Sequence, residues 1–121
     1  MKLRHLVERL DLGVLCGEDK LESEVNGGYV GDLLSDVMAN SSKGNIWITR
    51  QSHQNIIAVA SLREHAAIIL ALGKKPDDDT IEKATREGIP VLATDRPGFE
   101  IAGQVYALLS NDRSFRAGTE S

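Results

Sequence analysis

Residues 44–62 read GNIWITRQSHQNIIAVASL, in which a short apolar strand, a polar cluster and an apolar helix follow one another directly. In α/β proteins, ligands bind at the carboxyl ends of parallel strands, where loop side chains and free amides at helix N-termini converge. The stretch therefore predicts an α/β fold with a ligand site at the end of its strand. The polar side chains at that point are Thr49, Arg50, Gln51, Ser52, His53 and Gln54.

Strand and helix patterns alternate along the rest of the chain. Short apolar runs predict strands at 14–16, 46–49, 67–71 and 89–93. Apolar residues at helical spacing predict helices at 1–11, 32–40, 52–62 and 77–87. The pair Gly27-Gly28 indicates a turn or a close backbone approach. A last helix is expected to begin at Pro97 and to face the core through Ala102, Val105, Tyr106 and Leu109.

This alternation predicts a three-layer α/β/α architecture with a mainly parallel sheet. No repeat or long linker divides the chain, so we expect a single α/β domain over residues 1–110. Residues 111–121 are polar and predict a flexible tail. The helix at 55–62 is apolar around most of its circumference, which predicts that it is buried on more than one side, and we expect a homodimer interface to account for this.

The composition excludes several classes of partner. The formal net charge is -4 and the 14 basic residues form no run, so we expect no nucleic-acid partner. The longest apolar run, 66–72, is far shorter than a membrane span, and the first residues lack the apolar core of a signal peptide. We therefore expect a soluble, cytoplasmic protein with no membrane partner.

Motifs of common enzymes and metal sites are missing. The segment 73–76 reads GKKP, which lacks the earlier glycine and the hydroxyl residue of a phosphate-binding loop, and no G-x-G-x-x-G occurs. The histidines His5, His53 and His65 are not spaced to share a helical turn, and Cys16 is the only cysteine, expected to act as a small buried hydrophobe. We expect no catalytic residues, no metal and no cofactor.

The segments VNGGYVGDLLSDVMANSSKGNIWIT, HQNIIAVASL and GIPVLATDRPGFEIAGQVYALL resemble the DRTGG domain family. The resemblance implies an α/β/α fold similar to the N-terminal domain of HPr kinase/phosphorylase, and a regulatory or binding module that is often dimeric. It also implies similarity to small proteins encoded near iron-only hydrogenase genes, some labelled iron-sulfur-binding hydrogenase. Ser52-His53 stands where the family often has Asp-Arg, and Ala71-Leu72-Gly73 where it often has Thr-Gly-Gly. One cysteine cannot hold a conventional cluster, which needs about four thiolates.

The candidate site combines three predicted strand ends. Parallel strands end at the same edge of a sheet, so polar loops that follow them are expected to converge. Arg50 and Arg96 could bracket an anion, although each could equally be a surface charge paired with an acidic neighbour. His53 is either a ligand contact or a solvent-facing residue in the first helical turn. The expected ligand-binding residues are Thr49, Arg50, Gln51, Ser52, His53, Gly73, Lys74, Thr94, Asp95 and Arg96.

Three hypotheses of function follow. The first is a non-catalytic regulatory or ligand-binding module that binds a small anionic ligand or nucleotide at the strand ends. The second is an accessory protein of an iron-only hydrogenase or related redox system, docking through the apolar helix after Ser52 or its neighbour. The third is a small enzyme of unknown reaction that acts through Asp32, Asp36 and His53, although helix capping explains Asp32 more simply.

Overall fold

A computed structural model describes residues 1–112 of the chain. The predicted flexible tail at 111–121 therefore lies largely outside the described residues. Within them, no helix is long and apolar enough to cross a bilayer. A short 3₁₀ helix, Glu18–Lys20, follows the first strand. The elements in chain order are α1 (Leu3–Leu10), β1 (Gly13–Cys16), β2 (Gly27–Val30), α2 (Leu34–Asn40), β3 (Asn45–Thr49), α3 (Asn55–Arg63), β4 (Ala67–Leu70), α4 (Asp78–Glu87), β5 (Val91–Ala93) and α5 (Gly98–Asn111).

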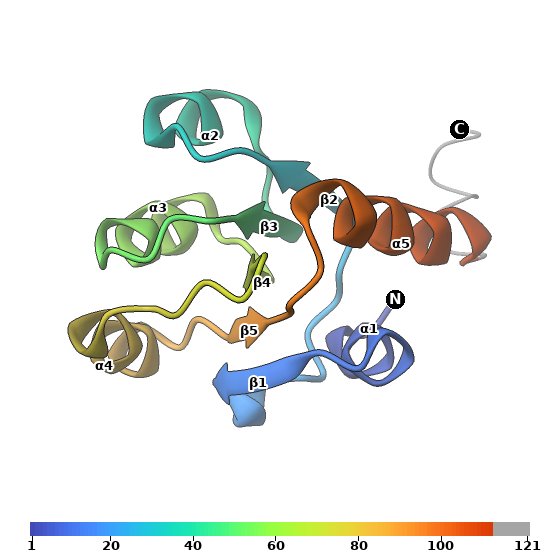
Figure 1. Ribbon diagram of the computed structural model, residues 1–121, viewed down its shortest axis with the longest axis horizontal. Helices are drawn as coiled ribbons and strands as arrows, with labels where there is room; N and C mark the ends of the chain where they lie inside the picture. Colours follow the sequence, from blue (N-terminus) through green and yellow to red (C-terminus); the bar gives the residue numbers. More distant parts are fainter. Residues whose placement is uncertain (113–121) are drawn as a thin grey trace.

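The strands form one mixed sheet in the order β1-β5-β4-β3-β2 (Figure 1). Strands β2 to β5 run parallel, and β1 runs antiparallel beside β5, with Gly13 opposite Ala93. The mainly parallel sheet is therefore confirmed. Its single antiparallel strand lies at the edge, so the start of β1 meets the end of β5.

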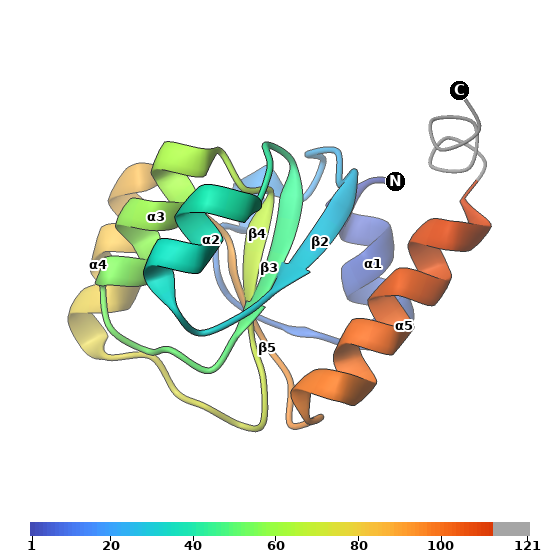
Figure 2. The same ribbon diagram turned by 90° about the horizontal axis from the view of Figure 1, so that it is seen from above.

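Helices cover both faces of the sheet, which confirms the three-layer architecture (Figures 1 and 2). Helices α1 and α5 pack on one face, and α2, α3 and α4 on the other. Successive side chains of a strand point to opposite faces. In β4, Ala67 and Ile69 accordingly face the first group of helices, while Ile68 and Leu70 face the second, and all four are buried.

The turn predicted at the glycine pair is wrong, because Gly27 and Gly28 begin the edge strand β2. Gly27 pairs with Asn45 and Gly28 with Ile46 in parallel register. Local sequence favours a turn at two glycines, but pairing with β3 determines the conformation here. The other alternative, close backbone approach, fits better, since a Cβ on Gly28 would lie 3.4 Å from the carbonyl oxygen of Ile46.

Helix α3 is buried within the chain itself. Ile56, Ile57 and Ala60 are fully buried between the sheet and its neighbours α2 and α4. Of its large apolar side chains only Leu62 is exposed, at 70%. The apolar circumference that predicted a subunit interface or docking surface is therefore accounted for by packing inside one chain, and this helix offers little apolar surface to a partner.

The core-facing side of α5 differs from the prediction. Ile101, Val105 and Leu109 are buried, as expected for residues four apart on one helical face. Tyr106, which was predicted to belong to that face, is 69% exposed, because it follows Val105 directly and points about 100° away from it. Helix α5 therefore has a buried face and a second, exposed face that also carries aromatic side chains.

A buried polar cluster joins the ends of α2 and α3 to the start of β4. The Ser41 hydroxyl donates to the carbonyl oxygen of Val37 (2.6 Å) and lies 2.8 Å from Nε2 of His65. Because that hydroxyl proton is already engaged, Nε2–H of His65 is the donor in the second contact. Arg63 donates to the carbonyl oxygen of Ser41. Burial, and secondarily the charge of Arg63, lowers the pKa of His65 to about 4.

Trp47 lies at the centre of the sheet face that this cluster adjoins. Its side chain is fully buried, and its Nε1–H donates to the carbonyl oxygen of Gly31 (2.8 Å). The ring also meets the imidazole of His65 edge to face, with 5.7 Å between centroids. Trp47 therefore joins β3 to the end of β2 and to the polar cluster.

Candidate functional site

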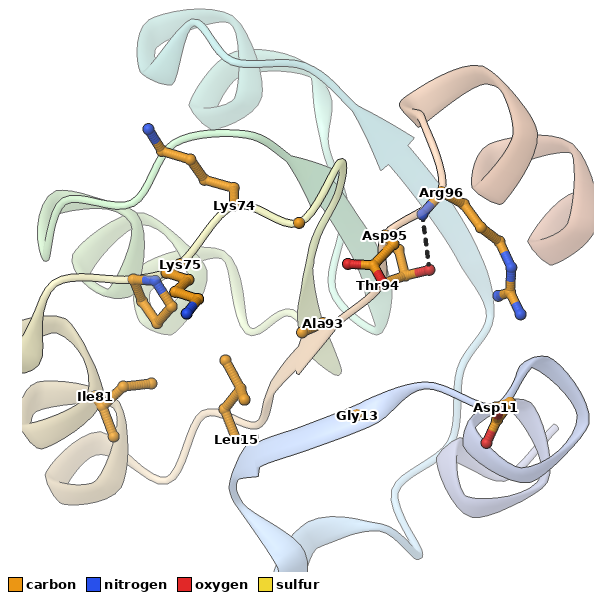
Figure 3. Close-up of a pocket in the computed structure, with 12 residues that line it drawn as sticks. Asp11, Gly13, Leu15, Lys74, Lys75, Ile81, Ala93, Thr94, Asp95 and Arg96 are labelled. Atoms are coloured by element: carbon orange, nitrogen blue, oxygen red, sulfur yellow. Dashed lines mark hydrogen bonds between the residues drawn. The ribbon is translucent and has the colours of Figure 1, made fainter.

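A pocket of about 770 Å³ lies where β4 and β5 end and β1 begins (Figure 3). The parallel direction of β4 and β5 brings their exits to one edge of the sheet, and the antiparallel β1 adds its first residues beside them. Helix α4 contributes one further side chain. The lining residues are Asp11, Gly13, Leu15, Gly73, Lys74, Lys75, Pro76, Ile81, Ala93, Thr94, Asp95 and Arg96.

The loops after β4 and β5 are tied together by backbone hydrogen bonds. The amide of Leu72 donates to the carbonyl oxygen of Arg96 (2.9 Å), and the amide of Gly73 donates to that of Thr94 (2.9 Å). Leu72 and Gly73 both have positive φ, 59° and 67°. The turn is tight: a Cβ on Gly73 would lie 3.2 Å from Oδ1 of Asp95. This turn fixes the loops that hold the cationic side chains.

The predicted site is divided by the structure. Only the predicted residues after β4 and β5 line this pocket, and the predicted residues after β3 do not. Figure 3 shows that the Lys74 ammonium group points away from the other lining side chains. Five of the ten predicted residues therefore lie at one pocket, namely Gly73, Lys74, Thr94, Asp95 and Arg96, and ligand binding by the predicted residues stays a prediction.

The loop after β3 is instead bound to the loop after β2. The buried Thr49 hydroxyl and the amide of Arg50 both donate to Oδ1 of Asp32, each at 2.8 Å. The side-chain amide of Gln51 donates to the backbone carbonyl of Asp32 (2.9 Å). Asp32 thus joins the ends of β2 and β3 rather than capping α2. Through these bonds Thr49, Arg50 and Gln51 stabilise the contact between the two loops.

Ser52 and His53 make hydrogen bonds to the first turns of α4 and α3, respectively. The carbonyl oxygen of Ser52 accepts from the hydroxyl of Thr80 (2.7 Å) at the beginning of α4. Nδ1 of His53 accepts from the amide of Asn55 (3.1 Å), the first residue of α3. The His53 side chain is exposed. The structure therefore matches the interpretation of His53 as a solvent-facing residue at the helix start.

Sequence reasoning missed the half of the pocket that comes from β1 and α4. Leu15 and Ile81 are distant in sequence from the predicted loops, and nothing in the sequence signals that β1 lies beside β5. Lys75 and Pro76 could have been found, because they directly follow Gly73 and Lys74 in the same loop. Extending each predicted strand exit to the next helix would have included them.

The pocket carries charges of both signs. Lys74 and Lys75 are exposed and make no ion pair with any residue in 1–112. Arg96 lies 3.9 Å from Glu100 through Nε, while its Nη1 is buried without a hydrogen-bond partner among the described residues. The carboxylates of Asp11 and Asp95 lie at the same pocket. It can therefore accept an anion and hydrogen-bond donors together.

The residues of the enzyme hypothesis are not assembled into one site. Asp32 is bound by Thr49 and Arg50, whereas Asp36 accepts from the hydroxyl of Tyr29. This bond raises the pKa of Tyr29. Within residues 1–112, His53 bonds only to the start of its own helix, and no hydrogen bond joins any two of the three groups. Among the described residues, no three His, Cys, Asp or Glu side chains are grouped so that they could hold a metal ion.

Comparison with known proteins identifies the family. Residues 5–108 match the DRTGG domain. A crystal structure of the CBS and DRTGG domains from the regulatory region of Clostridium perfringens pyrophosphatase, in complex with its activator diadenosine tetraphosphate, is similar in fold with a TM-score of 0.68 and 19% identity. The similarity covers 84% of this chain and 44% of that one, so the chain spans less than half its length. No curated protein sequence matches significantly. Because the family match extends over most of its length, this chain belongs to the DRTGG domain family.

Proposed function

We propose that this chain is a non-catalytic regulatory module that binds a small anionic ligand in the pocket at the ends of β4 and β5. The observation that carries the proposal is that Lys75 and Arg96, from the hydrogen-bonded loops after β4 and β5, line the same pocket. Nη1 of Arg96 is buried there and has no hydrogen-bond partner among the described residues. An unpaired buried donor is costly unless a ligand or water completes it. The fold it shares with a regulatory region crystallised with a nucleotide activator supports the same role.

Binding is tested by thermal unfolding with a panel of phosphorylated metabolites and nucleotides. A ligand at about one hundred times its Kd is expected to add about 2.7 kcal/mol to the free energy of unfolding, which raises the Tm by several degrees. The double variant Lys75→Ala/Arg96→Ala is expected to lose the shift, because it removes two of the pocket's cationic groups.

A matched control removes the same charges elsewhere. Lys43→Ala/Arg50→Ala also deletes one lysine and one arginine, both exposed and outside the pocket. It is expected to keep the full shift. Loss of binding in this variant, with binding retained in Lys75→Ala/Arg96→Ala, would move the site to the loop after β3. Absence of any shift across the panel would contradict the proposal itself.

We also propose that two copies associate through the exposed side of α5 and the edge strand β2. This β2–α5 groove has a volume of about 940 Å³. Phe99, Tyr106 and Val30 project around it with exposed fractions of 95%, 69% and 54%. Gly28 and Gly103 also line the groove and have no side chain to fill it, and a Cβ on Gly103 would meet nothing within 4 Å. A two-fold interface needs a self-complementary surface, and projecting aromatic side chains beside an open groove provide the two shapes that such a surface combines.

Charge supports this choice of surface. Glu100 is the only charged residue among the residues of α5, whereas α1 and α4 carry several charges of both signs. Depletion of charge and enrichment of aromatic residues distinguish the centres of protein interfaces from other surfaces. We therefore propose this groove, rather than α3, as the interface of a homodimer.

Sedimentation at micromolar concentration tests the homodimer. The wild type is expected to sediment as a dimer and Tyr106→Asp as a monomer, because a buried unpaired carboxylate strongly opposes association. Leu62→Asp places the same charge on the exposed side of α3 and is expected to remain dimeric. A monomeric wild type would contradict the proposal; capture of a hydrogenase subunit through this groove would then favour the accessory-protein hypothesis.

A further inference from the structure

The pocket at the ends of β4 and β5 has an apolar end and a charged end. Leu15 and Ile81 lie together at one end, and Asp11 and Arg96 lie at the other (Figure 3). An inorganic anion would use only the charges and would leave the apolar side chains in water. The volume of about 770 Å³ lies in the range of sites that bind whole metabolites. The apolar end therefore indicates a ligand with a body larger than its anionic group.

Asp95 lies between the two ends and faces the tight turn at Gly73. Its Oδ1 would be 3.2 Å from a Cβ on Gly73, so the carboxylate stands directly over that turn. It is exposed and receives no hydrogen bond or ion pair from a side chain in residues 1–112. A carboxylate accepts hydrogen bonds from hydroxyl or amino groups and repels a phosphate. The ligand is therefore expected to present donors at this point, as the paired hydroxyls of a ribose do.

The cation at the charged end is Arg96, whereas Lys75 lies on the side of Leu15 and Ile81 in Figure 3. Nη1 of Arg96 is buried without a hydrogen-bond partner among residues 1–112. Arg96 can balance one phosphate, whereas a polyphosphate would bring further negative charge towards Asp11 and Asp95. The charge distribution thus favours a monophosphate over a di- or triphosphate.

We infer that the pocket binds a nucleoside monophosphate. The base packs on Leu15 and Ile81, the ribose hydroxyls donate to Asp95, and the phosphate pairs with Arg96 at the opposite end. This inference rests on the proposed ligand-binding function and adds the class of ligand and its orientation.

Calorimetric titration of the full chain with AMP, adenosine, inorganic phosphate and ATP tests the ligand class. AMP is expected to bind at least about tenfold more tightly than the other three, since only AMP uses all parts of the pocket without excess charge. Equal affinity for AMP and phosphate, or tighter binding of ATP, would overturn the inference while leaving an anion-binding module in place. Binding of none of the four would overturn it as well, and the wider metabolite panel then decides the proposed function separately.

The orientation is tested with AMP and 2′,3′-dideoxy-AMP. In the wild type, loss of the ribose hydroxyls is expected to weaken binding by about tenfold, the effect of leaving a charged acceptor without its donors. Asp95→Asn is expected to reduce this ratio to about two, because the neutral amide accepts less strongly. Asp19→Asn, an exposed carboxylate outside the pocket, should keep the wild-type ratio. An unchanged ratio in Asp95→Asn would overturn the assigned orientation.

Discussion

The variant Trp47→Ala is expected to lose about 3–5 kcal/mol of the free energy of unfolding, enough to unfold much of a domain of this size. Trp47 is fully buried on the sheet face covered by α2, α3 and α4, so its removal leaves a large cavity. It also removes the donor to the carbonyl of Gly31 and the ring that packs on His65. Urea denaturation followed by circular dichroism measures the loss, since Trp47 is the only tryptophan and its fluorescence disappears with it.

Two further variants separate the effect of the cavity from that of the lost hydrogen bond. Trp47→Phe keeps most of the apolar volume but leaves the carbonyl of Gly31 without the indole donor, and an intermediate loss of about 1–3 kcal/mol is expected. Leu62→Ala changes a side chain that is 70% exposed and should stay within about 0.5 kcal/mol of the wild type. A Trp47→Ala protein as stable as Leu62→Ala would show that the sheet packs differently.

Lowering the pH from about 7 to about 4.5 is expected to destabilise the fold through His65, by up to about 3 kcal/mol. The pKa of this histidine falls from 6.5 in the unfolded chain to about 4 in the fold, because burial opposes the charged imidazole. Below pH 6.5 the unfolded chain therefore binds a proton at His65 that the folded chain does not bind. The free energy of unfolding falls until the pH reaches the pKa of His65 in the fold. Above pH 6.5 both states are neutral at this site and no dependence on pH arises from it.

The variant His65→Gln isolates this effect, because glutamine can donate to Ser41 but does not titrate. Carboxylates elsewhere also titrate at low pH, so the measured quantity is the difference in unfolding free energy between wild type and variant at each pH. The unfolding free energy of the wild type minus that of the variant is expected to decrease as the pH falls, because only the wild type carries the buried histidine. Parallel pH profiles for the two proteins would contradict the assignment of the neutral, buried imidazole.

Residues with strong apolar patterns were placed correctly from sequence, and the reason is physical. Strand β4 is a continuous apolar run that can be stable only between two layers of helices, and it lies at the centre of the sheet. Of the two alternatives for the glycine pair in β2, the turn was wrong because the strand conformation there depends on pairing with β3, which local sequence does not record. Helix α3 was correctly predicted to be buried, but its cover comes from α2 and α4 rather than from a second chain.

The sequence predicted the sheet edge at which this pocket lies, and part of the residues that line it. Polar residues after β4 and β5 converge because parallel strands end together, a rule that sequence patterns can use. Thr49 and Arg50 were included for the same reason, but Asp32 from the loop after β2 takes up their donors. Leu15 could not be predicted, since its place in the pocket depends on the antiparallel pairing of β1 with β5.

The pairing of β1 with β5 has a consequence for the order in which the sheet forms during synthesis. Of the five strands in residues 1–112, β1 is synthesised first, yet its partner in the sheet is β5, which is synthesised last. Contacts between distant segments form late, because the chain between them must first be ordered. Strand β1 therefore stays unpaired until β5 has been synthesised, and the pocket lined by both strands can form only after that point.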